Sequence, residues 1–184
     1  RTDSRLHLCY VGSLEENRFI KSAVEVVSQE PRVKLTLAGM NTLQDYVQDA
    51  ANRYPNINYL GQVSYWEALK LYSTCDLMFA VYDPAVPNHR YSAPNKVYEA
   101  MMLGKLLIVA KNTGFDSLIE REGIGLSIDY SQQAFKQALD YFLANPDMLK
   151  KMGKRARQVY ARYSWSVMRE RLLRAYADLE DVSI

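Results

Sequence analysis

Short apolar runs alternate with amphipathic segments along most of this chain, and this alternation limits the folds that it can adopt. Each apolar run is bounded by glycine or other turn residues, which is typical of a buried strand. The segments between the runs carry apolar residues at the spacing of a helix face. Six strands are predicted in this way, at residues 6–12, 33–38, 57–60, 77–81, 106–110 and 125–128.

Capping signals locate several of the helices between these strands. Ser13 and Glu16 form the pattern of a capping box and predict a helix through Val27, and Ser64 with Glu67 predicts a helix through about Thr74. Further helices are predicted at about 41–54 and 94–103 and within 113–122, the first of these starting at Asn41-Thr42. After the last strand the alternation stops, and three consecutive helices are predicted at 131–144, 146–162 and 164–178.

Strands that alternate with helices indicate a parallel sheet covered on both faces. The predicted fold class is therefore α/β, with a doubly wound, Rossmann-like, six-stranded parallel sheet and a C-terminal helical tail. Residues 1–184 form one predicted domain, with a core at 5–144 and the C-terminal helices at 146–178. Ligands of such sheets bind beyond the carboxyl ends of the strands, so the loops after the first, fourth and fifth strands are the candidate sites.

Composition narrows the class of protein further. Hydrophobic residues make up 48% of the chain, and no apolar run approaches the ~20 residues of a membrane-spanning helix. The first residues show no signal-peptide region, and only Cys9 and Cys75 are present, so we expect a reducing, cytoplasmic location and cysteines packed in the core. His7 and His89 lack the spacing of metal ligands, and no metal site is expected. The fourteen tyrosines are expected mostly at the boundary between core and solvent.

Charge is distributed unevenly along the chain. The formal net charge is +2, which does not indicate a nucleic-acid binder, but residues 145–174 hold nine Lys and Arg against two acidic residues. This stretch is either a patch for an anionic lipid or acidic partner, or the solvated face of amphipathic helices. We favour the solvated face, because no exposed apolar residues are expected beside the charge. The core side of these helices is assigned to Leu149, Met152, Val159, Leu172 and Tyr176.

The loop after the first predicted strand, residues 12–18, is the first candidate site. Gly12 lets the backbone approach a ligand closely, a helix start offers free N–H groups to a phosphate, and Arg18 can pair with phosphate oxygens. The alternative is a plain capped turn with a solvated arginine. Motif strength alone favours that alternative, because the loop is neither a GxGxxG nor a P-loop.

The long loop at 82–93 and the helix start that follows it form the second candidate site. Asn95, Lys96 and the first helical amides can bind an anion, and Glu99 one turn later is a natural acceptor for sugar hydroxyls. The alternative is ordinary helix capping with an ion pair between Lys96 and Glu99. The residues alone leave both interpretations open.

Several segments, in order along nearly the whole chain, resemble motifs of the family 4 glycosyltransferases with the GT-B fold. Residues 10–18 resemble their Val-Gly-Arg-Leu-x-x-x-Lys-Gly segment, and residues 92–105, Ser-Ala-Pro-Asn-Lys-Val-Tyr-Glu-Ala-Met-Met-Leu-Gly-Lys, are similar to their S-x-P-n-K-x-x-E-x-m-a-x-G-k-P block. Residues 35–39, 58–63, 71–77 and 163–165 resemble further segments of the same family. The resemblance implies the C-terminal, donor-binding half of a two-domain enzyme whose N-terminal half binds the acceptor.

The resemblance also implies roles for individual residues. Gly12 and Ser13 would face the diphosphate, and Arg18 would take the place of a phosphate-binding lysine. The backbone at Val63 would hold the base, and Glu99 would bind the ribose. Pro94, Asn95 and Lys96 would place helix amides at the phosphates.

Three positions depart from the family pattern. Ser13 replaces a phosphate-binding arginine, and Leu106 replaces the usual proline. Tyr91 stands where the family has the first glutamate of a Glu-x7-Glu pair, which usually contacts the donor sugar. These departures put the donor sugar and the competence of the enzyme in question.

The implied reaction is retaining transfer of a sugar from a nucleotide-diphospho-sugar, with Arg18, Lys96 and Glu99 as the catalytic set and with no metal or cofactor. The isolated half is expected to bind nucleotide weakly and to transfer nothing without its N-terminal acceptor domain. Two alternatives stay open: half of a GT-B nucleotide-sugar epimerase, against which the low number of histidines argues, and a non-catalytic nucleotide-sugar binding module. Many relatives build lipid-linked or cell-surface glycans, so polysaccharide biosynthesis and peripheral membrane contact through the parent enzyme are further expectations. In this family the helical tail packs back toward the absent half.

Overall fold

A six-stranded parallel sheet forms the centre of the molecule, which we describe for residues 4–180 from a computed structural model. The strand order is β3-β2-β1-β4-β5-β6. The chain therefore runs outward from β1 in one direction and then, from β4, in the other, which is the doubly wound topology. The predicted fold class is confirmed. The strands are β1 (Leu6–Val11), β2 (Val33–Ala38), β3 (Ile57–Tyr59), β4 (Leu77–Ala80), β5 (Leu106–Ala110) and β6 (Gly125–Ile128).

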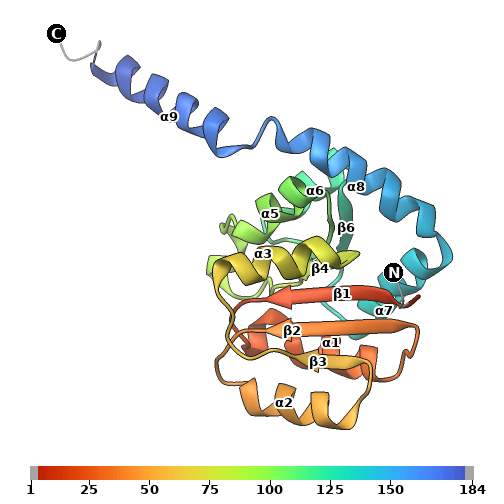
Figure 1. The fold of residues 1–184 in the computed structure, drawn as a ribbon. Helices are drawn as coiled ribbons and strands as arrows, with labels where there is room; N and C mark the ends of the chain where they lie inside the picture. Colours follow the sequence, from red (N-terminus) through yellow and green to blue (C-terminus); the bar gives the residue numbers. More distant parts are fainter. Residues whose placement is uncertain (1–3, 181–184) are drawn as a thin grey trace.

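Helices cover both faces of the sheet (Figure 1). On one face α1 contacts α2 and α7, and on the other α5 contacts α3 and α8, with α6 also packed against α8. The helices are α1 (Ile20–Ser28), α2 (Gln44–Arg53), α3 (Tyr65–Thr74), α4 (Pro87–Arg90), α5 (Asn95–Leu103), α6 (Asp116–Glu122), α7 (Gln132–Ala144), α8 (Pro146–Tyr160) and α9 (Trp165–Glu180), with a 3-10 turn at Glu16–Arg18. The predicted loop at 82–93 thus contains one short helix, α4.

The core is built from the strands, and every residue of β4 and β5 is buried. Both cysteines are buried and unpaired, as their apolar surroundings predicted. Tyr10, Tyr72 and Tyr82 are also buried, which corrects the expectation that tyrosines would lie mostly at the boundary for these three. The hydroxyl groups of Tyr10 and Tyr72 and the ring of Tyr82 lie near the carboxyl ends of the strands. Polar partners there offset the cost of burial.

The capping box predicted at Ser13 and Glu16 is wrong. Phe19 adopts a left-handed conformation with φ of 63°, and α1 begins only at Ile20. The reason is tertiary: the amide of Asn41 donates to Ser13 Oγ (3.0 Å) and to Glu15 Oε1 (2.8 Å), so the cap hydroxyl is held by the next loop.

The start of α2 also differs from the prediction, again because two loops bind each other. Asn41 Oδ1 accepts a bond from Thr42 N, and Leu43 N donates to Leu14 O. The segment 41–43 therefore pairs with the first loop, and α2 begins at Gln44 instead of Asn41-Thr42. By contrast, the capping box predicted at Ser64 and Glu67 is present at the start of α3.

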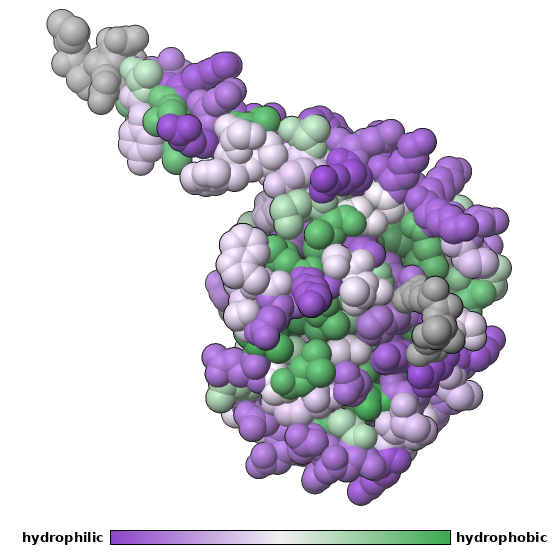
Figure 2. Space-filling view, viewed as in Figure 1, coloured by the Kyte–Doolittle hydropathy of each residue, from purple (hydrophilic) through white to green (hydrophobic). Residues whose placement is uncertain are grey.

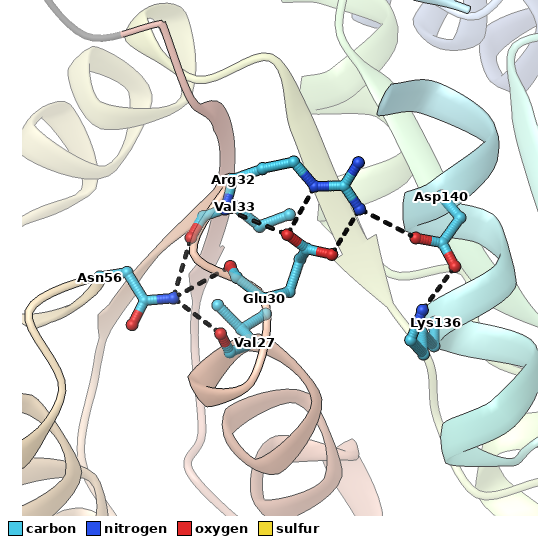
Figure 3. Close-up of polar contacts among 7 residues, drawn as sticks. All are labelled: Val27, Glu30, Arg32, Val33, Asn56, Lys136 and Asp140. Carbon is cyan, nitrogen blue, oxygen red and sulfur yellow. Dashed lines mark hydrogen bonds and ion pairs between the residues drawn. The ribbon is translucent and has the colours of Figure 1, made fainter. Parts of the chain in front are cut away.

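A polar network lies at the opposite end of the sheet, where β2 and β3 begin (Figure 3). Asn56 donates from Nδ2 to three backbone carbonyls, those of Val27, Glu30 and Val33. The Glu30 carboxylate accepts bonds from the Arg32 guanidinium at 2.6 and 2.8 Å. These contacts lock the turn between α1 and β2 against the start of β3, well away from the carboxyl ends of the strands.

The helical tail divides into a packed part and a projecting part. Helix α8 lies close to α5, because Gly104 and Gly153 allow their backbones to meet: a Cβ on Gly153 would lie 2.6 Å from Gly104 O. Helix α9 extends away from the sheet domain (Figure 1), and Figure 2 shows hydrophobic residues on it among hydrophilic ones.

This projection corrects two expectations about the basic stretch. Leu172 and Tyr176 do not face a core, since they are 51% and 61% exposed. Exposed apolar residues do accompany the basic charge, because no element of residues 4–180 covers that side of α9. The exposed large apolar residues of α9 are Trp165, Leu172, Leu173, Tyr176 and Leu179. No helix within residues 4–180 is long and apolar enough to cross a membrane.

Candidate functional site

Two adjoining hollows lie where the first and fourth strands end. The Arg18 hollow, about 240 Å³, is lined by Tyr10, Ser13, Arg18, Tyr82, Asn88, Ser92, Ala93, Pro94 and Lys96. The Glu99 hollow, about 270 Å³, is lined by Val11, Val63, Ser64, Tyr65, Ala68, Tyr72, Tyr82, Pro94, Asn95, Lys96 and Glu99. Tyr82, Pro94 and Lys96 line both, so the two hollows form one continuous candidate site at the edge predicted from the topology.

Gly12 makes the junction of the two hollows possible. Its φ of 151° lies in the region that favours glycine, and a Cβ there would lie 3.0 Å from Lys96 Nζ. The absence of a side chain at Gly12 therefore gives the Lys96 ammonium its place at the end of β1.

Lys96 is almost fully buried, with 8% of its surface exposed. Its ammonium donates to Val11 O at 2.5 Å and lies 4.3 Å from the centroid of the Tyr10 ring. Burial lowers the pKa of Lys96 to about 8, although the charge of Glu99 opposes this shift. No ion pair between Lys96 and Glu99 is formed within residues 4–180, so the ion pair considered from their sequence spacing is wrong.

Arg18 comes from the 3-10 turn and lies over an aromatic ring. Its guanidinium carbon is 4.1 Å from the centroid of Tyr82, a residue that is only 5% exposed. The alternative of a plain capped turn therefore fails, because no side chain within residues 4–180 caps the turn or α1, and the partly buried Arg18 rests on a ring. Neither Tyr10 nor Tyr82 was among the site residues expected from the sequence. The available signal was that each tyrosine lies at or just beyond the end of a buried strand, next to a candidate cation.

Ser13 is held in the wall of the Arg18 hollow by two neighbours. Its hydroxyl accepts a bond from Asn41 Nδ2, and its carbonyl accepts a bond from the Tyr10 hydroxyl at 2.8 Å. The backbone N–H of Ser13 has no hydrogen-bond acceptor among the contacts of residues 4–180. Ser13 lines the hollow, so its N–H is a candidate donor to an anion there.

The start of α5 supplies further donors. Pro94 occupies the N-cap position, so the N–H groups of Asn95 and Lys96 are free of intrahelical partners. The positive end of the helix dipole adds to the two side-chain cations.

Glu99 lies one turn further along α5 and is half-buried. Burial raises its pKa, and the nearby charge of Lys96 acts in the opposite direction. Opposite Glu99, the hollow is walled by Val63, Ser64, Tyr65 and Ala68 from the loop before α3 and from α3 itself. A buried hydroxyl fixes the floor: the Tyr72 oxygen bonds both Val11 N and Val11 O at 3.1 Å.

Tyr91 lies apart from these residues. Its side chain is 88% exposed and lines a different hollow, with Pro84, Ala85, Arg90, Asn112 and Gly114. The structure therefore brings together eight of the nine residues singled out from the sequence: Gly12, Ser13, Arg18, Val63, Pro94, Asn95, Lys96 and Glu99.

This arrangement can be compared with known families and structures. The model of a family described as "Glycosyl transferases group 1" matches residues 2–159. The chain belongs to the group 1 glycosyl transferases. Its predicted resemblance to the GT-B members is confirmed. No curated protein matches the sequence.

Solved structures similar to this group 1 glycosyl transferase share its fold at low sequence identity. Sucrose-phosphate synthase from Thermosynechococcus elongatus has a TM-score of 0.81 and 20% identity, over 100% of this chain and 47% of that chain. Anabaena Alr3699/HepE in complex with UDP has a TM-score of 0.80 and 17% identity, over 95% of this chain and 49% of that chain. The cholesterol-alpha-glucosyltransferase catalytic domain from Helicobacter pylori has a TM-score of 0.67 and 15% identity, over 86% of this chain and 99% of that chain. The chain spans about half the length of the first two structures.

Proposed function

We propose that this chain is the donor-binding half of a retaining glycosyltransferase, which transfers a sugar from a nucleotide-diphospho-sugar to an acceptor. One observation carries the proposal: Arg18 and Lys96 line one hollow, and Lys96 also lines the adjoining hollow, together with Glu99 and with Asn95 at the start of α5. Cations and amides suit a diphosphate, and the carboxylate suits ribose hydroxyls. The similar Anabaena protein in complex with UDP or UDP-glucose supports a donor of this class.

The chemistry follows from the charges of the site. Negative charge develops on the departing nucleoside diphosphate as the bond to the sugar breaks. Arg18, Lys96 and Ser13 line one hollow and the first N–H groups of α5 lie beside it, so we expect them to stabilise that charge with little reorganisation. We propose that these groups suffice without a metal ion or cofactor. Glu99 holds the ribose and so fixes the diphosphate against the cations.

The other half of the parent enzyme supplies the acceptor. The chain spans about half of its first structural neighbours, and the apolar side of α9 is left uncovered by the described residues. We propose that α9 docks on the N-terminal acceptor half, and that this chain alone binds the donor but transfers no sugar.

A second function, a non-catalytic nucleotide-sugar binding module, is favoured by one observation. Tyr91 takes the place of a donor-contacting glutamate and lies outside both hollows of the site. Activity of the two reunited halves on a nucleotide-sugar separates the two functions, because a binding module would retain the donor without consuming it.

Calorimetric titration with UDP, GDP, ADP and their sugars tests the proposed site. We expect one nucleoside diphosphate to bind, and both Arg18→Ala and Glu99→Ala to weaken it about tenfold or more, since each removes a charged hydrogen-bonding partner. Arg53→Ala is the matched control, because Arg53 is an exposed arginine at the end of α2. Absence of binding by every nucleotide, or unchanged affinity in both site variants, rules out the proposed site.

A further inference from the structure

Tyr65 is an exposed aromatic residue in a wall that two hollows share. It lines the Glu99 hollow and also a larger hollow of about 740 Å³ between α5 and the tail, to which Tyr98, Met102, Tyr163 and Trp165 contribute. The Tyr65 side chain is 56% exposed, so the core does not require it. A large aromatic ring that faces a binding hollow without packing in the core is available to a ligand.

The backbone of Tyr65 is ordered before any ligand arrives. Tyr65 is the first residue of α3, directly after the Ser64–Glu67 capping box. Its ring lies 5.7 Å from the ring of Trp66, centroid to centroid, at 59°. Trp66 itself is 77% exposed and lines neither hollow. A ring carried by an ordered backbone loses less conformational freedom when a partner stacks on it.

The space beside Tyr65 fits a flat ring with a polar edge. Ala68 lies one turn along α3 and presents only a methyl group to the hollow, which leaves room in front of the Tyr65 ring. The peptide groups of Val63 form no hydrogen bonds with other residues in 4–180 and are available to a polar edge. Glu99, across the hollow, is placed to accept hydroxyl groups of an attached sugar.

We propose that Tyr65 stacks on the nucleobase of the donor and forms the outer wall of the nucleoside site. The inference rests on the proposed function and adds a residue to it. Stacking on the face of a base tolerates any base, so Tyr65 contributes affinity for the nucleoside as a whole, while the Val63 backbone is left to distinguish its edge.

The test separates the base from the phosphates. Calorimetric titration of the full chain compares two ligands: the nucleoside diphosphate that binds most tightly, and inorganic pyrophosphate, which lacks the base. The affinity for pyrophosphate is also measured by its competition with the nucleoside diphosphate. For Tyr65→Ala we expect affinity for the nucleotide to fall about tenfold and affinity for pyrophosphate to stay within twofold. Tyr65→Phe keeps the ring and restores most of the affinity, and Trp66→Ala is the matched control, with an effect of less than about threefold.

A spectroscopic readout supports the titration. In a Tyr65→Trp, Trp66→Phe double variant, a base that stacks on the new indole quenches its fluorescence, whereas pyrophosphate leaves it unchanged. Unchanged nucleotide affinity in Tyr65→Ala, an equal loss for pyrophosphate, or the absence of quenching overturns the assignment of Tyr65 and leaves the proposed function intact. Failure of the wild-type chain to bind any nucleotide overturns both.

Discussion

At the scale of residues, the site is organised by two cations that each rest on a tyrosine. The Arg18 guanidinium lies on the Tyr82 ring and the Lys96 ammonium on the Tyr10 ring, and both rings are buried. A ring face attracts a cation without neutralising it, unlike a carboxylate. The two positive charges are thereby held in place and stay available to an anion.

Replacement of Tyr82 tests this arrangement. Tyr82→Leu removes the ring beneath Arg18, and we expect nucleoside diphosphate to bind about three- to tenfold more weakly. Tyr82→Phe keeps the ring and retains most of the affinity. Titration calorimetry on both variants measures the difference, alongside their melting temperatures. Equal losses in the two variants, or none in either, contradict a role for the ring.

The pKa of Lys96 gives the site a predictable pH dependence. In the empty chain this pKa is lowered to about 8 because the ammonium is buried. A bound diphosphate raises it again, so binding takes up a proton above pH 8. We expect nucleotide affinity to be level below about pH 8 and to fall by up to tenfold for each further pH unit. The slope should be absent in Lys96→Met, measured by titration at pH 7 to 9.5; a wild-type profile that is flat over this range contradicts the prediction.

Much of the site was predictable at this scale, and the reason is topological. Residues 12–18 and 92–99 follow β1 and β4, which are neighbours in the sheet, so their convergence follows from strand order alone. The tyrosines beneath the cations were not predictable, since ring orientation depends on packing. The actual partner of Lys96, Val11 O, is 85 residues distant in the chain, whereas the expected partner Glu99 is three residues away.

At the scale of elements, the two capping boxes show what local sequence decides. The box at Ser64 forms because no other group in the described part of the chain binds its hydroxyl, and α3 begins where predicted. The box at Ser13 fails because Asn41 from the next loop binds that hydroxyl. The same signal therefore succeeds in an exposed helix start and fails where a second loop packs against it.

The Glu30–Arg32 pair belongs to this scale, since it joins α1 to β2 (Figure 3). Hydrogen bonds from Arg32 lower the pKa of Glu30 to about 2, against an ordinary value of 4.5. A lowered carboxyl pKa stabilises the fold above pH 4.5, and that contribution is lost as the pH falls toward 2.

We expect Glu30→Gln to destabilise the chain by about 1 kcal/mol at pH 7 and to have little effect near pH 2. Urea unfolding at the two pH values measures the difference. The matched control is Glu25→Gln, an exposed carboxylate on α1. A destabilisation that is the same at both pH values would show that the charge of Glu30 is not responsible.

At the scale of the whole molecule, the sheet order was predictable and the course of the tail was not. Right-handed crossovers leave few arrangements for six alternating strands. The tail gave the same amphipathic signal as a packed helix, so Leu172 and Tyr176 were assigned to a core. No element within residues 4–180 covers them, and no pattern inside the chain reveals that.

Removal of the projecting helix tests whether α9 packs against the rest of the described chain. A chain that ends at Ser164 loses α9, whose apolar residues are largely exposed, and we expect the melting temperature to change by less than about 4 °C. Differential scanning calorimetry on the two lengths measures the change. The double variant Leu172→Gln, Leu179→Gln should likewise leave melting unchanged but weaken association with the proposed N-terminal acceptor half in a pull-down. A drop of 10 °C or more on truncation contradicts an uncovered α9.

The glycine contact between α5 and α8 has a geometric consequence for the assembled enzyme. Helix α5 holds Asn95 and Lys96 at one end, and at the other it meets α8 at Gly104 and Gly153. Nine residues of helix span about 13 Å. Because residues 161–164 connect α8 to α9, the length of α5 contributes to the distance between the proposed phosphate site and the proposed docking helix. One extra turn in α5 after Glu99 would lengthen this distance by about 5 Å, and in the proposed two-domain enzyme it would displace the acceptor half from the donor.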